Sequence, residues 1–264
     1  MMAQIGGTPA GGVTRLALSE EDRIARDLLR DWALEAGFTC DVDSMGNMFI
    51  RRAGLHSDLA PVMTGSHVDS QPLGGNYDGI YGVLAGLELL RTLNDNRVET
   101  ERDIVLVNWT NEEGARFAPA MLASGVWAGQ LTEEFAYARM DSKRVTVRDA
   151  LEAIGYRGEQ PARAFPVHAC YELHIEQGPI LEDEAIDIGL VRAAMGQRWF
   201  TITLDGFAAH AGTTPMHRRR DALTAFAALA LHVEEIGSQH APARRATIRT
   251  APVTPHSRNV VPTL

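Results

Sequence analysis

Strand-like apolar runs alternate with helix-like segments between residues 61 and 175, and this alternation constrains the fold more than any other feature. The strand-like runs are residues 61–66, 104–109 and 170–175. Two segments with the apolar spacing of helices, residues 79–93 and 147–154, separate them. Buried strands that alternate with helices are typical of an α/β fold. The sequence therefore predicts a mostly parallel sheet with flanking helices.

Side chains that commonly bind metals follow the strand-like runs or precede the first helix. They are His67, Asp78, Glu112, Glu113 and His174. Ligands of such sheets collect beyond the carboxyl ends of the strands, so we expect these side chains to meet there. Mixed imidazole and carboxylate ligands suit a hydrolytic site with two metal ions. Two adjacent glutamates would repel each other unless one binds a cation and the other acts as general base.

Each of these residues also has a purely structural interpretation. Taken alone, a histidine near a strand end such as His67 is more often a satisfied structural residue, although Asp69 is placed to accept its second N–H. Asp78 precedes a helix and suits the N-cap position. The pair Glu112–Glu113 suits an exposed acidic loop, and the alternation around His174 suits a histidine that faces the core.

The composition excludes several classes of partner. The 264 residues carry a net charge of −9, from 25 basic and 34 acidic side chains, which argues against nucleic acid or an anionic membrane as partner. Two cysteines, Cys40 and Cys170, are too few for a disulfide framework and fit a reducing compartment. The longest apolar helix-like stretch is too short to span a bilayer, and the N-terminus lacks the pattern of a signal peptide. We expect a soluble, cytoplasmic protein.

The pattern changes after Gly189, which predicts a second domain. Two strands are expected at residues 199–204 and 246–250, with a strongly apolar helix at residues 221–236 between them. We expect a metal-binding domain over residues 1–192 and a smaller domain over residues 193–264. A strand pair at residues 38–42 and 47–51 is expected near the start of the first domain.

Several longer motifs carry a resemblance to a known family. They are GSHVDSQPLGG, YDGIYGVLAGLE, NWTNEEGARFAPAMLASG, ELHIEQGPILE and AHAGTTPMHRRRDAL. The chain resembles the hydantoinase/carbamoylase group of dinuclear zinc amidohydrolases, within the carboxypeptidase-G2-like superfamily. The group includes N-carbamoyl-L-amino acid hydrolases, allantoate amidohydrolase and β-ureidopropionase. The resemblance implies a zinc-exopeptidase-like catalytic domain and a smaller α+β lid and dimerisation domain.

The resemblance also implies a role for each candidate residue. His67 and His174 would bind one metal, Glu113 the other, and Asp78 would bridge them. Glu112 would be the general base. Three residues would bind the substrate or its transition state: Gln177, His210 and Asn259. The small neighbours of His210 let its ring approach an oxyanion, although a simple loop histidine and, for Asn259, a turn residue are the alternatives.

Members of the group are longer, and the sequence departs from their pattern in two positions. The resemblance implies a last histidine ligand for the metal bound by Glu113, and an arginine that grips the substrate carboxylate. Neither has a counterpart here. We expect both domains to be incomplete.

The expected activity is hydrolysis of the ureido C–N bond of an N-carbamoyl amino acid, with release of ammonia and carbon dioxide. Two divalent metal ions are the expected cofactors: zinc, with manganese, cobalt or nickel as alternatives. Allantoate amidohydrolase and β-ureidopropionase are alternatives within the group, and a peptidase or aminoacylase is a more distant one. A homodimer is expected. An inactive fragment that serves only as an association module is the alternative of a different class.

Overall fold

The computed structural model describes residues 1–242, 244–254, 260 and 263. It divides into two compact units, Met1–Gly189 and Leu190–Leu264. The sequence placed the boundary between residues 192 and 193, three residues later. The assignment of a catalytic role to the first unit and a lid role to the second stays a prediction.

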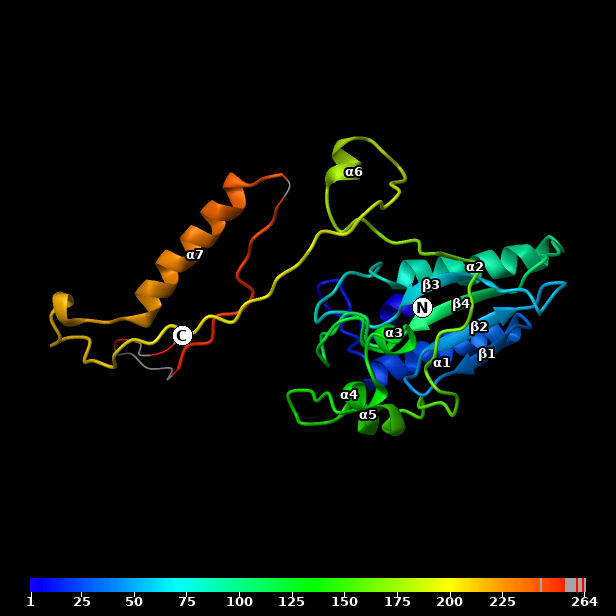
Figure 1. The fold of residues 1–264 in the computed structure, drawn as a ribbon, viewed down its shortest axis with the longest axis horizontal. Helices are drawn as coiled ribbons and strands as arrows, with labels where there is room; N and C mark the ends of the chain where they lie inside the picture. The colour runs from blue at the N-terminus through cyan, green and yellow to red at the C-terminus, as the bar shows by residue number, and fades with distance from the viewer. Residues whose placement is uncertain (243, 255–259, 261–262, 264) are drawn as a thin grey trace. The chain divides into compact units, whose positions relative to one another are not determined.

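The first unit is built around one five-stranded sheet, whose strands have the order β1-β2-β4-β3-β5. Figure 1 labels β1 to β4. The strands are β1 Thr39–Val42, β2 Met48–Arg52, β3 Val62–His67, β4 Ile104–Trp109 and β5 Ala169–Tyr171. Strand β4 has the predicted bounds, whereas β5 stops before the predicted end at residue 175. The segment that carries His174 therefore lies beyond the sheet.

The sheet is mixed, which corrects the prediction that it is mostly parallel. Strand β3 pairs in parallel with β4 and β5, whereas β2 pairs antiparallel with both β1 and β4. The predicted strand pair forms the antiparallel hairpin of β1 and β2. A short turn between them allows only antiparallel pairing, and the Asp43 carboxylate stabilises it by accepting the backbone N–H of Met45 and Asn47, both at 2.9 Å.

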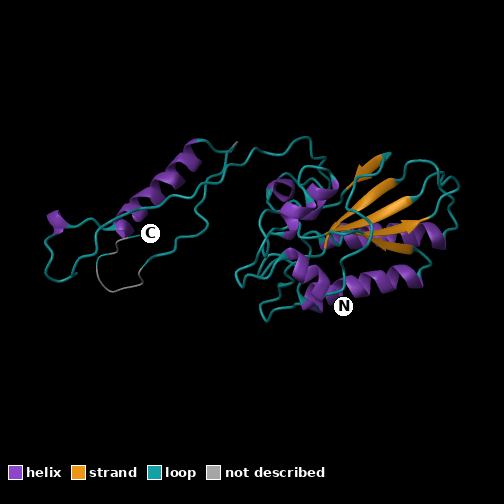
Figure 2. Cartoon of the chain, turned by 60° about the horizontal axis from the view of Figure 1, so that its bottom comes forward, coloured by secondary structure: helices purple, strands orange, loops and turns teal. Residues whose placement is uncertain are grey.

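Helices α1 and α2 cover one face of the sheet (Figure 2). The helices of this unit are η1 Met2–Gln4, α1 Glu20–Glu35, α2 Ile80–Asp95, α3 Leu122–Trp127, α4 Glu133–Tyr137, α5 Val147–Ala153 and α6 Ile180–Asp183. Leu29 of α1 and Leu87 of α2 share one core cluster with Leu106 of β4. The neighbouring Val105 and Val107 belong to a separate cluster, because alternate strand residues face opposite sides.

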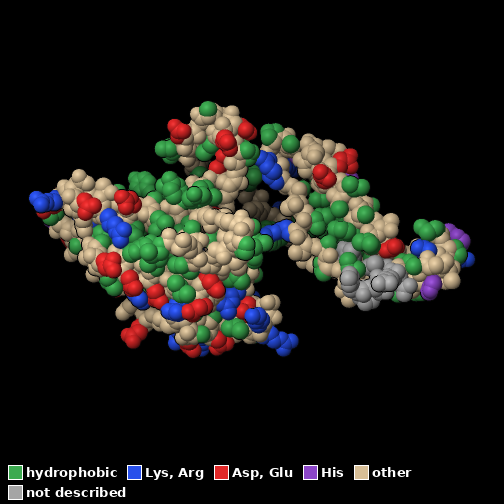
Figure 3. Space-filling view, turned by 180° about the vertical axis from the view of Figure 1, so that it is seen from behind, with side chains coloured by type: hydrophobic (Ala, Val, Ile, Leu, Met, Phe, Trp, Pro, Cys, Tyr) green, Lys and Arg blue, Asp and Glu red, His purple; other side chains and the backbone are tan. Residues whose placement is uncertain are grey.

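Charge is mixed on the surface of the first unit. On the face visible in Figure 3, acidic and basic side chains are interspersed over this unit. The net negative charge is therefore not gathered into a single patch on that face.

In the second unit the α+β architecture expected from the sequence is not evident. Its described residues contain η2 Met216–Arg218 and the helix α7 Ala222–Gln239, which continues past Gly237. Neither of the two predicted strands forms; pairing among the described residues is limited to isolated bridges such as Ala209 with Val260. Within α7, whose residues are all described, Ala222 alone is buried. Among the helices of the described ranges, none has the length and apolar character needed to cross a membrane.

Candidate metal centre

Parallel strands deliver the candidate residues to one edge of the sheet. Strands β3 and β4 end side by side, with His67 opposite Trp109. The chain then leads from β4 to Glu112 and Glu113, while Asp78 lies two residues before α2. His174 follows β5, the other parallel neighbour of β3. The sheet thus explains why residues distant in the sequence meet at this edge.

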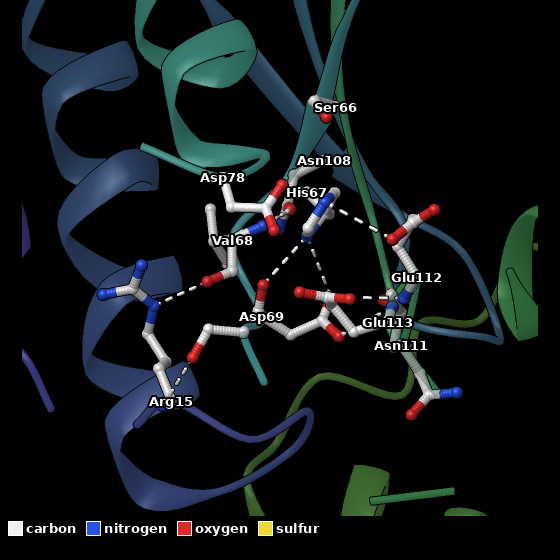
Figure 4. A network of polar contacts seen from close by, with 12 residues as sticks. Arg15, Ser66, His67, Val68, Asp69, Asp78, Asn108, Asn111, Glu112 and Glu113 are labelled. Carbon is white, nitrogen blue, oxygen red and sulfur yellow. Dashed lines mark hydrogen bonds and ion pairs between the residues drawn. The ribbon is translucent and has the colours of Figure 1, made fainter. Parts of the chain in front are cut away.

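His67 is buried, and both of its ring nitrogens have neighbours (Figure 4). Its Nδ1 lies 2.8 Å from the main-chain oxygen of Asp69, which accepts a hydrogen bond from it. Its Nε2 lies 3.4 Å from Oε2 of Glu112. The hydrogen bond at Nδ1 leaves the lone pair of Nε2 available to a cation when the ring is neutral.

His174 repeats this arrangement beside Asp78. Its Nδ1 lies 2.8 Å from the main-chain oxygen of Ile175, and its Nε2 lies 3.3 Å from Oδ1 of Asp78. Its side chain is 31% exposed, so the core-facing alternative is wrong. The other oxygen of Asp78 accepts a 2.6 Å hydrogen bond from Nε2 of Gln177.

His67, Asp78 and His174 form the set that fits a metal ion. One possible ligand atom from each lies within 4.8 Å of the others. The N-cap alternative for Asp78 is wrong, because Gly79 occupies that position and α2 has no side-chain cap. Two imidazoles whose Nδ1 groups are fixed by main-chain oxygens, together with one carboxylate, are a donor set that zinc and similar divalent cations accept.

Asp69 connects the β3 end to the two glutamates. Its carboxylate accepts the backbone N–H of Glu112 at 3.2 Å and of Glu113 at 3.3 Å. The sequence suggested that this carboxylate would hold His67, but its Oδ1 is 3.8 Å from Nδ1 and the main-chain oxygen takes that role. The carboxylate turns away because it satisfies the N–H groups of these two half-buried residues.

Burial and charge shift the pKa values at this edge. Burial raises the pKa of Asp69 to about 7, against the opposing charge of His67. Burial also raises the pKa of Glu112, opposed by His67 and reinforced by Glu113. For His67, burial lowers the pKa, but the charges of Asp69 and Glu112 outweigh it and the net shift is upward. A carboxylate with a raised pKa is suited to exchange protons near neutral pH.

Glu113 does not belong to the three-residue set that fits a metal. Its carboxylate instead accepts hydrogen bonds from Gln71, at 3.0 Å from the side-chain Nε2 and 3.3 Å from the main-chain N. The pair Glu112–Glu113 is half-buried rather than an exposed loop, and the Glu112 side chain is 34% exposed. The role of Glu113 as a ligand stays a prediction.

Two candidates, His210 and Asn259, belong to the second unit. His210 is exposed, and its Nδ1 accepts the backbone N–H of Gly212 at 3.1 Å and of Thr213 at 3.2 Å. In the neutral ring its Nε2 therefore carries the proton and is a donor. Asn259 lies outside the described residues.

Sequence reasoning missed several residues that position the site. Gly79 has a φ of +66°, and a Cβ there would lie 2.3 Å from Nε2 of His67, so the ring occupies the space that a side chain would need. Arg15 donates from Nε to the main-chain oxygen of Val68 at 2.6 Å, and Asn108 accepts the N–H of Val68 at 3.0 Å. The glycine before a helix was a usable signal; the partners of Arg15 and Asn108 were not visible in any local pattern.

Comparison with known proteins identifies the family. Peptidase family M20/M25/M40 matches residues 63–257, which include every candidate residue except Asn259. The chain belongs to this family. Its relatives place it in the hydantoinase/carbamoylase group, as the motifs indicated.

The chain is similar to the N-carbamoyl-L-amino-acid amidohydrolase of Rhizobium meliloti, with 47% identity over 99% of this chain and 63% of the relative. It is also similar to two crystal structures of hydantoinase/carbamoylase family amidases. The one from Burkholderia vietnamiensis has 54% identity and a TM-score of 0.92, over 99% of this chain and 64% of that chain. The one from Burkholderia multivorans has 56% identity and a TM-score of 0.84 over the same shares. The chain thus spans less than two thirds of the length of these relatives.

Proposed function

We propose that the protein is a metal-dependent amidohydrolase that cleaves the ureido C–N bond of N-carbamoyl amino acids or similar linear amides. The observation that carries the proposal is the convergence of His67, Asp78 and His174, with Glu112 within 3.4 Å of His67. The 47% identity to an N-carbamoyl-L-amino-acid amidohydrolase supports the choice of substrate class.

Two divalent cations, zinc in the first place, would be held by this edge of the sheet. His67 and His174 would bind one, Glu113 would bind the other, and Asp78 would lie between them. When bound, such ions lower the pKa of a water molecule toward neutrality and polarise a carbonyl oxygen. Metal binding requires neutral imidazoles with a free nitrogen, and the main-chain acceptors at both Nδ1 positions select the tautomer whose Nε2 is free.

Glu112 is the proposed general base. Its carboxylate takes a proton from the attacking water, and the resulting hydroxide adds to the ureido carbonyl carbon. Glu112 then returns the proton to the leaving nitrogen as the C–N bond breaks, which releases ammonia. The carbamate that remains loses carbon dioxide and leaves the free amino acid. The raised pKa of Glu112 suits both proton transfers.

His210, Gln177 and Asn259 are the proposed substrate-binding residues. The hydrogen bonds at Nδ1 of His210 support a donor role for its Nε2, as an oxyanion requires. We also propose that the second unit is the lid and dimerisation domain and that the protein is a homodimer. Light scattering that finds only monomer over a wide concentration range would contradict the dimer.

The substitution Glu112→Gln tests the reaction. It removes the proton acceptor but keeps the shape, so we expect bound metal to stay and turnover of an N-carbamoyl-L-amino acid to fall about 10²–10⁴-fold. Ammonia release measures turnover, and elemental analysis measures bound metal. The matched control is Glu134→Gln on α4, where the side chain is exposed and turnover should be unchanged.

Three results would contradict the proposal in different ways. Unchanged turnover in Glu112→Gln would exclude Glu112 as the base. Cleavage of dipeptides without ammonia release from ureido substrates, allantoate included, would favour a peptidase. A protein that binds no metal and releases no ammonia would favour the association module.

A further inference from the structure

The carboxylate of Glu113 is held on both sides by one residue, Gln71. Oε1 of Glu113 accepts the main-chain N–H of Gln71 at 3.3 Å, and Oε2 accepts its side-chain amide at 3.0 Å. The same amide lies 3.3 Å from the main-chain oxygen of Glu113. Three hydrogen bonds therefore fix both the side chain and the backbone of Glu113 relative to the loop after β3.

The main chain of Gln71 is itself anchored, which fixes the point from which its side chain extends. Its main-chain oxygen accepts the hydroxyl of Ser70 at 3.0 Å and the N–H of Gly74 at 3.1 Å. Gln71 is half-buried, so its amide competes with only part of the bulk solvent. The anchoring means that the orientation of the Glu113 carboxylate is set before any ligand arrives.

The chemistry of the donor is informative. A guanidinium or ammonium in this place would neutralise Glu113, whereas the neutral amide orients the carboxylate and leaves its negative charge intact. A carboxylate has about four lone-pair positions, and Gln71 occupies two of them. The remaining positions stay available to a cation. Hydrogen-bonded partners of this kind commonly orient ligating carboxylates.

The side chains of the two adjacent glutamates, Glu112 and Glu113, have different partners. Both have their backbone N–H groups held by Asp69. The side chain of Glu112 reaches toward His67, while that of Glu113 is turned to Gln71. The separation keeps two carboxylates that would repel each other in distinct places.

We infer that Gln71 is a positioning residue that holds Glu113 in the orientation needed to bind a cation, and so sets the affinity for the ion associated with Glu113. This inference rests on the proposed function, because it takes Glu113 as a ligand. It leaves the ion associated with His67 and His174 unaffected, since no hydrogen bond joins the side chain of Gln71 to either histidine among the contacts described.

The test is a metal titration of the parent protein and of Gln71→Met, with Zn²⁺ and with Mn²⁺ against a competing chelator. Methionine matches the length of glutamine but cannot donate, so we expect the weaker binding step to lose about 10–100-fold in affinity. The tighter step should not change. Gln130→Met, at an exposed position, is the matched control and should keep both affinities.

Two further measurements separate positioning from folding. The thermal midpoint in excess chelator measures what the lost amide hydrogen bonds cost the fold, and a role in stability alone would lower this midpoint and leave metal affinity in place. Gln71→Asn keeps an amide one methylene shorter, and we expect it to recover part of the lost affinity. If Gln71→Met does not fold, Gln71→Asn becomes the test variant. We then expect Gln71→Asn to lower the affinity of the weaker binding step relative to the parent.

The outcomes are distinguishable. A parent that binds no divalent cation would overturn both this inference and the proposed function. A parent that binds cations with the same affinities as its Gln71 variants, or through a single step that they leave unchanged, would overturn this inference alone.

Discussion

Two segments deliver a histidine to the metal centre, and they differ in how firmly each is held. Strand β3 ends at His67, whose side chain is 2% exposed, and in the loop that follows both main-chain groups of Val68 are bonded to buried side chains of other segments. The segment after β5 carries His174 at 31% exposure, and the acceptor for its Nδ1 is the next residue in the chain. Both histidines donate from Nδ1 to a main-chain oxygen, but His67 is packed more closely by other segments than His174 is.

The contrast indicates that one half of the site is preorganised and the other is held by the site itself. The segment of His174 is tied to the rest through a 2.6 Å hydrogen bond from Gln177 to Asp78 and one of 2.5 Å from the Ser66 hydroxyl to Glu172. A segment with few buried contacts gains more order when a ligand binds than one that is already packed. The β3 loop therefore provides the fixed reference for the site.

The largest expected effect comes from filling the space beside the ring of His67. Gly79→Ala would place a Cβ 2.3 Å from Nε2 of His67 and force a side chain onto a φ of +66°. The ring would have to leave its position, so we expect metal affinity to fall by about 100-fold or more. This loss is larger than that expected when a hydrogen-bond partner of a ligand is removed. Strain and overpacking should also lower the free energy of unfolding by ~2–4 kcal/mol.

Gly75→Ala provides the matched control. Gly75 lies in the same loop, but a Cβ there would meet open space and its φ is not in the left-handed region. Chelator competition gives the metal affinity of both variants, and urea denaturation gives their stability. If both alanines had the same small effect, the β3 loop would be as adaptable as the segment of His174, and the comparison would fail.

The sequence could predict which residues meet at the site better than the contacts that hold them in place. Periodic apolar runs place β3, β4 and α2, and parallel strands meet at one edge, so the proximity of His67, Asp78 and His174 followed from topology. The pairing of Gln71 with Glu113 could not be predicted, because it depends on the path of an irregular loop. The same holds for Asp69, whose main-chain oxygen rather than carboxylate receives His67.

The second unit was predicted least well. The runs at residues 199–204 and 246–250 have strand composition, but composition alone does not make a strand. A strand needs a neighbour to satisfy its N–H and C=O groups, and that neighbour is not encoded in the run itself. The helix α7 was predicted because its hydrogen bonds are all local.

The smallest expected effect comes from removing the hydrogen bond between Gln177 and Asp78, which joins the segment after β5 to the rest of the site. Gln177→Met would remove the amide that donates to Oδ2 of Asp78. Methionine has the same side-chain length as glutamine and tolerates the φ of 55° at this position about equally well. The bond is exposed, so we expect ~1 kcal/mol, or about fivefold, in metal affinity. Hydrogen exchange should rise at residues 172–178 and stay the same at residues 67–71, because the β3 loop has its own anchors. Equal changes in both segments would mean that the two histidines belong to one cooperative unit, and the distinction between a fixed and a dependent half would no longer hold.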